Sequence, residues 1–145
     1  MLGFLKHRNK RRLGQELAET DSRIAVLKIE LAAKMIKLAA QTDDLAPLKQ
    51  AEEALSSARN YYTFETIPLE VGLVHIALGD MLMRLGTEKS NKGAIASALE
   101  SYRAAITLAS VHGDDNQRLI LRKKAKKAES LLGRRPPPPS LFKVA

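Results

Sequence analysis

Apolar residues recur along most of the chain at the three-, four- and seven-residue intervals that place side chains on one face of an α-helix. In the first such segment the apolar stripe consists of Leu17, Ile24, Leu27, Leu31, Met35 and Leu38. Asp43 and Asp44 supply capping oxygens for the second segment, and Gly86 and Gly133 are expected to end the third and fifth. The pattern predicts five helices, at residues 13–40, 47–62, 68–85, 95–111 and 116–132. No segment shows the sustained alternation of a β-strand, so the predicted fold class is all-α.

Charge and proline patterns divide the chain into a body and two short ends. Its 145 residues suffice for one domain with a buried core. Residues 1–12 hold five Lys or Arg and no acid, and we expect them to form a basic N-terminal arm. Residues 13–133 are expected to form the helical domain. Residues 134–145 contain four consecutive prolines, which predict an extended tail outside that domain.

Composition argues against an enzyme. The chain has no cysteine, which excludes disulfides, thiolate metal sites and cysteine nucleophiles. His7, His75 and His112 lie far apart in the sequence, and no metalloprotease, phosphate-loop or nucleophile-elbow motif occurs. We therefore expect no cofactor, no metal and no small-molecule substrate. No stretch is apolar enough to span a bilayer, and the N-terminus lacks the order of a secretory signal, so the expected location is cytoplasmic.

An internal repeat emerges when the sequence is shifted by 47 residues. Large apolar residues then fall on large ones, and small residues on small ones. The matched pairs are Leu31 with Leu78, Ala32 with Gly79, Met35 with Leu82, Leu38 with Leu85, Ala51 with Ala98, Leu55 with Tyr102, and Ala58 with Ala105. The agreement spans two helices and the loop between them, which indicates two copies of one helix pair.

The second copy resembles the tetratricopeptide repeat family in its Leu78-Gly79, Leu82, Ala98, Tyr102 and Ala105. His75 stands where that family usually has tryptophan, and the spacing of 47 residues exceeds the usual repeat of about 34. The chain is thus similar to a long-loop bacterial variant, over roughly residues 24–110. The resemblance implies an antiparallel helix-pair array of about two repeats plus a C-terminal capping helix. The N-terminal surface of such an array has no evident cover, which makes self-association one alternative.

The resemblance also implies that the first helix of each pair lines a concave groove. Independently, each of these helices carries a second apolar stripe beside its packing stripe. A helix that is apolar on two sides is normally buried on both of them. The predicted partner-binding groove consists of Val26, Ile29, Ile36, Lys37, Leu73, Ile76, Asp80, Met83 and Arg84. Its apolar members would supply contact area, and Lys37, Asp80 and Arg84 would orient a bound helix or peptide. Three occupants are open: the chain's own fifth helix or tail, a second copy, or another protein.

Basic residues crowd the fifth predicted helix. They are Arg118, Arg122, Lys123, Lys124, Lys126 and Lys127. One interpretation is a solvated outer face of a capping helix. The other is that this basic patch and the N-terminal arm contact phosphate groups of nucleic acid or an anionic membrane. The sequence therefore favours a non-enzymatic protein–protein interaction module, a small adaptor or assembly subunit, with a basic surface binder as the alternative.

Overall fold

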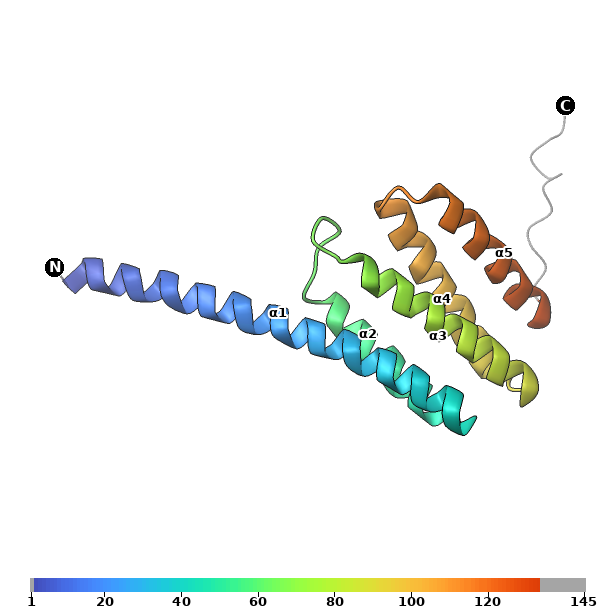
Figure 1. Cartoon of the computed structure of the whole chain (residues 1–145). Helices are drawn as coiled ribbons and strands as arrows, with labels where there is room; N and C mark the ends of the chain where they lie inside the picture. The colour runs from blue at the N-terminus through green and yellow to red at the C-terminus, as the bar shows by residue number, and fades with distance from the viewer. Residues whose placement is uncertain (1, 134–145) are drawn as a thin grey trace, which may run out of the picture.

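The computed structural model describes residues 2–133, with side chains from residue 10 onward. Its five helices are α1 (Leu2–Thr42), α2 (Ala46–Arg59), α3 (Leu69–Glu88), α4 (Lys92–Val111) and α5 (Asp115–Leu131) (Figure 1). No strand occurs among these residues, so the all-α fold class is confirmed. The prediction of a proline-rich tail at 134–145 lies outside the described residues.

The helices form a linear array of two antiparallel pairs followed by a single helix (Figure 1). Helix α1 packs against α2, α3 against α4, and α5 against α4. The two pairs join mainly through α3, which also contacts α1 and α2. Each helix thus contacts its neighbours in the array, as the predicted repeat requires.

The turn inside each pair has the same unusual backbone conformation. Asp43 follows α1 and Ser90 follows α3, and both non-glycine residues adopt a φ of 51°. The two positions are 90 − 43 = 47 residues apart, which is the repeat length seen in the sequence. Left-handed backbone is uncommon in residues with a Cβ atom, so its recurrence in register supports the internal repeat.

Close helix crossing explains the glycines of α3. A Cβ atom on Gly79 would lie 2.7 Å from Cε1 of Tyr102, so this glycine leaves space for the aromatic ring of α4. The prediction that Gly86 ends the helix is wrong, because α3 continues to Glu88. A Cβ atom on Gly86 would lie 3.1 Å from side-chain atoms of both Ala94 and Ile95. Gly86 therefore permits close approach of α4 instead of terminating α3.

Helix α1 differs from the prediction at its start and in the face that it buries. It begins at Leu2, with no boundary near residue 13. Its buried face consists of Ala25, Ile29, Ala32, Ile36 and Ala39. The predicted packing stripe is instead largely open to solvent, with Leu27 62% and Leu31 45% exposed. Because alanine side chains are small, α2 can approach α1 closely on this face, and this is the face of α1 that becomes buried.

The position of α1 at the end of the array explains why its stripe is uncovered. In α3 the residues equivalent to Leu31 and Leu38 are Leu78 and Leu85, and both are buried. Leu78 lies between α2 and α4, with side chains of both helices around it. Among the described residues, α1 packs chiefly against α2 and α3, and neither helix covers Leu31 or Leu38.

Candidate functional site

The structure keeps only part of the predicted groove open. Ile29 and Ile36 are each 8% exposed and belong to the core, so their assignment to a partner-binding surface is wrong. Both residues lie on the alanine-rich face of α1, which packs against the rest of the array. Val26 and Lys37 remain exposed on α1. The remaining predicted groove residues all lie on α3.

An apolar hollow lies between α3 and α5, with α4 beneath it. It measures about 190 Å³, and its lining consists of Leu69, Gly72, Leu73, Ile76, Ala105, Leu108, Ala109, His112, Asp114 and Gln117. Leu73 is 61% exposed and Ile76 is half-buried at its edge. Because α3 supplies the large apolar side chains and α4 contributes alanines to the floor, the surface presents apolar contact area to a bound chain.

A second hollow continues this surface toward the other end of α3. It measures about 220 Å³ and is lined by Asp80, Met83, Tyr102, Lys124 and Lys127. Ile76 and Asp80 are one helical turn apart, so the two hollows follow each other along α3. We call the two together the α3–α5 groove. The α3 wall was predicted from the sequence, the fifth helix was one of the three open occupants, and the contribution of α4 was not predicted.

Side chains of three helices form hydrogen bonds with one another at Asp80, within the α3–α5 groove. The hydroxyl of Tyr102 donates to Oδ1 of Asp80 at 2.7 Å, and Lys124 Nζ donates to both carboxylate oxygens at 2.9 and 3.0 Å. Burial and the hydrogen bond to Asp80 raise the pKa of Tyr102 far above its ordinary value, so the phenol stays protonated and donates. Asp80 therefore ties α3 to α4 and α5. No local sequence pattern indicates this contact, because the partners of Asp80 lie 22 and 44 residues away from it.

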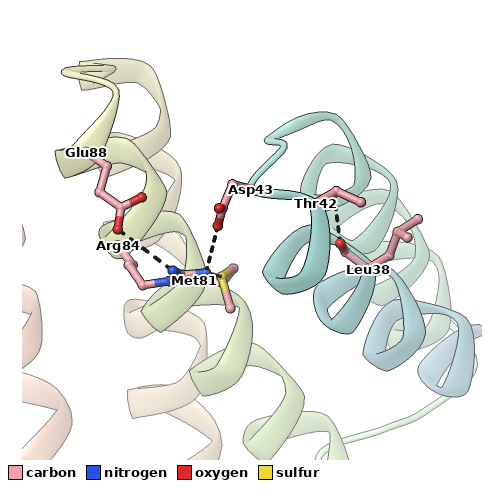
Figure 2. Close-up of polar contacts among 6 residues, drawn as sticks. All are labelled: Leu38, Thr42, Asp43, Met81, Arg84 and Glu88. Carbon is pink, nitrogen blue, oxygen red and sulfur yellow. Dashed lines mark hydrogen bonds and ion pairs between the residues drawn. The ribbon is translucent and has the colours of Figure 1, made fainter.

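Arg84 lies toward α1 and away from α5. Its guanidinium forms an ion pair with Asp43 of the α1–α2 turn at 3.4 Å and another with Glu88 at 3.7 Å (Figure 2). Nη2 of Arg84, the nitrogen that pairs with Asp43, also lies 3.4 Å from the sulfur of Met81. Arg84 thus connects the two helix pairs at their shared end, and it does not face the hollow that Lys124 and Lys127 border.

The basic residues of α5 divide into two groups. Arg118 pairs with Asp115 at 3.3 Å, and Lys124 pairs with Asp80. The other four, Arg122, Lys123, Lys126 and Lys127, are exposed, and the described part of the chain gives them no ion pair. Lys127 borders the groove. By helical spacing, Arg122 and Lys126 lie on the opposite side of α5.

No family model matches the chain, and neither does any curated protein or any solved structure. Function must therefore be inferred from the geometry. Between residues 10 and 133, no group of three or more His, Cys, Asp or Glu side chains is placed to hold a metal ion. None of the described helices is both long enough and apolar enough to cross a membrane.

Proposed function

We propose that the protein is a small non-enzymatic adaptor that binds a segment of another protein in the α3–α5 groove. The observation that carries this proposal is the exposed Leu73 beside Ile76, above an apolar floor to which α4 contributes Ala105, Leu108 and Ala109. A leucine that is 61% exposed gains free energy when a partner removes it from water, about 25 cal/mol for each Å² of apolar surface. The occupied groove would resemble the concave surface of tetratricopeptide repeats, the family that the sequence resembles.

The charge of α5 specifies the chemistry of the bound segment. Ile120, Lys124, Lys127 and Leu131 recur at four- and three-residue intervals, so they share one face of α5. Ile120 is 50% exposed on that face, and Lys127 has no acidic partner among the described residues. An amphipathic helix with apolar residues on one face and acidic residues beside them would complement both walls of the groove.

Peptide selection tests this proposal directly. A library of displayed helical peptides, selected on the full chain, is expected to enrich sequences that place Asp or Glu next to Leu, Ile or Phe. Leu73→Asp should abolish binding of the selected peptides, and Lys127→Glu should weaken it. Leu27→Asp is the matched control, because Leu27 is as exposed as Leu73 but lies on α1. Binding that survives Leu73→Asp contradicts the groove assignment.

A second candidate function rests on the exposed basic residues of α5 that face away from the groove. Arg122 and Lys126 could contact phosphate groups of nucleic acid or of an anionic membrane. The discriminating measurement is binding to duplex DNA and to phosphatidylserine vesicles at low and high salt. The variant with Arg122→Glu and Lys126→Glu should lose such binding and retain the selected peptides.

A further inference from the structure

The uncovered apolar stripe of α1 follows a seven-residue repeat. We call it the α1 stripe; its members are all exposed except the half-buried Ile24, and they are Leu13, Leu17, Ile24, Leu27, Leu31 and Leu38. Four of its members are spaced by seven residues, at positions 17, 24, 31 and 38. Leu13 and Leu27 occupy the intermediate position of the same repeat. This is the spacing of a helix that pairs along its length with another helix.

The N-terminal part of α1 protrudes from the body (Figure 1), and the seven-residue spacing continues from the packed part of the helix onto this protruding part. Every residue from 10 to 23 is exposed. Residues 13 to 38 span about 37 Å at 1.5 Å per residue. An isolated helical segment of this kind is marginal in water, so a long helix packed along it would stabilise the protruding part. In α3 the equivalent face is covered by helices α2 and α4, which indicates that a helix also fits here.

Flanking charges select one arrangement of two α1 helices. In an antiparallel pair related by a two-fold axis between residues 25 and 26, Leu13 lies opposite Leu38 and Ile24 opposite Leu27 of the other copy. We call the line of contact between the two α1 stripes the seam. The charged residues that flank it then meet in three pairs: Glu16 with Lys37, Arg23 with Glu30, and Asp21 with Lys28. All three pairs are of opposite charge, and each occurs twice in the dimer.

The other registers of the same stripe bring like charges together. A shift of one heptad toward the N-terminus pairs Glu16 with Glu30 and Arg23 with its own copy. A shift toward the C-terminus pairs Arg23 with Lys37 and Glu30 with its own copy. A parallel dimer in register pairs Glu16 with Asp21 and Arg23 with Lys28. Only the antiparallel arrangement centred between residues 25 and 26 is complementary among these four.

Two polar residues fit within this seam. Thr20 lies opposite Leu31, and its hydroxyl already donates to the carbonyl oxygen of Glu16 at 2.8 Å, so its methyl group is available for packing. Lys34 lies opposite Leu17 and is exposed, so its ammonium group can extend into water beyond the seam. Such polar layers specify register in paired helices.

We propose that the protein forms a homodimer in which the α1 stripes of two copies pair antiparallel about a two-fold axis between residues 25 and 26. In this dimer, α1 of each copy covers the exposed α1 stripe of the other copy. The dimer does not depend on the proposed function, because the α3–α5 groove lies on other helices and remains open.

Sedimentation of the full chain is the first test. The wild-type chain should sediment as a dimer at about 100 µM and dissociate on dilution. The double variant Leu27→Asp with Leu31→Asp should be a monomer, and its body should stay folded because both side chains are exposed within one copy. Leu73→Asp is the matched control and should remain dimeric. A monomeric wild-type chain at this concentration overturns the proposal, and so does a dimer that the double variant leaves intact.

Charge exchange tests the register without disturbing the apolar stripe. Glu16→Lys should weaken the dimer about tenfold, because it places like charges together at two sites. Adding Lys37→Glu should restore it. Glu16→Lys also removes an exposed ion pair between Arg12 and Glu16 of one copy, at 3.4 Å. Lys37→Glu cannot restore that contact, so rescue reports on the dimer, and absence of rescue contradicts this register.

Introduced cysteines test the orientation, because the natural chain contains none. The double variant Leu13→Cys with Leu38→Cys should form disulfides between copies under oxidising conditions. Leu13→Cys alone should not, because its two copies would lie about 37 Å apart along the axis. Efficient cross-linking of the single variant indicates a parallel dimer and overturns the proposal.

Discussion

His75 makes the stability of the fold dependent on pH. Its side chain is 6% exposed, and neither ring nitrogen has a hydrogen-bond partner in the described part of the chain. Burial lowers the pKa of His75 to about 4, and the nearby Arg59 acts in the same direction. In the unfolded chain the pKa should lie near 6.5. The unfolded state therefore binds more protons between these values, and stability should fall as the pH drops from 6.5 toward 4.

The size of this effect follows from the two pKa values. Between neutral pH and pH 5.5, protonation of the unfolded chain should lower the free energy of unfolding by about 1.4 kcal/mol. The substitution His75→Leu isolates this effect, because it removes the titrating imidazole and places an apolar side chain in the buried site. The variant should lack this loss and should be more stable than the wild type at pH 5.5.

Urea unfolding followed by circular dichroism at pH 7.5, 6.5 and 5.5 measures the effect. At each pH, the difference between the free energies of unfolding of wild type and variant isolates the contribution of His75, because Glu52 is present in both chains. Burial raises the pKa of Glu52, so its titration acts in the opposite sense. If His75→Leu loses as much stability between pH 7.5 and 5.5 as the wild type, the reasoning about the buried imidazole is refuted.

Three further substitutions test the packing and polar contacts by the same urea assay. Gly79→Ala should destabilise by about 1–3 kcal/mol, because its Cβ would lie 2.7 Å from the ring of Tyr102; a neutral effect would mean that the ring moves freely. Tyr102→Phe should cost about 1.5 kcal/mol through loss of its hydrogen bond to Asp80, and an unchanged midpoint would contradict this. Arg84→Ala should change stability by less than about 1 kcal/mol, since its ion pair with Asp43 is exposed; a larger loss would show that this contact holds the two helix pairs together.

The fold was predictable because local and repeating signals determine most of it. The apolar intervals located all five helices, and the pairing of like residues at a shift of 47 indicated that four of them form two equivalent pairs. The end of α3 was missed because a glycine at a helix crossing and a glycine at a helix end look alike in one sequence.

The candidate site was predicted less well because its position depends on which faces neighbouring helices cover. Ile29 and Leu31 differ by only two positions, and both are apolar, yet only Ile29 is buried. The choice between them depends on what precedes α1 in the array, and the repeat comparison treats the two pairs as equivalent. Contacts across three helices, such as that of Asp80 with Lys124, have no local signal in the sequence.

The linear arrangement of the helices also determines where the fold opens most easily. In arrays whose elements contact only their neighbours, terminal elements detach at a lower free energy than central ones. Amide hydrogen exchange should therefore be slowest in α3 and α4 and faster in α5, which packs chiefly against α4. Because α5 forms one wall of the α3–α5 groove, a bound segment would join the least stable wall to the most stable one. Occupancy of the groove should then appear as slower exchange along α5, far beyond the residues that touch the ligand.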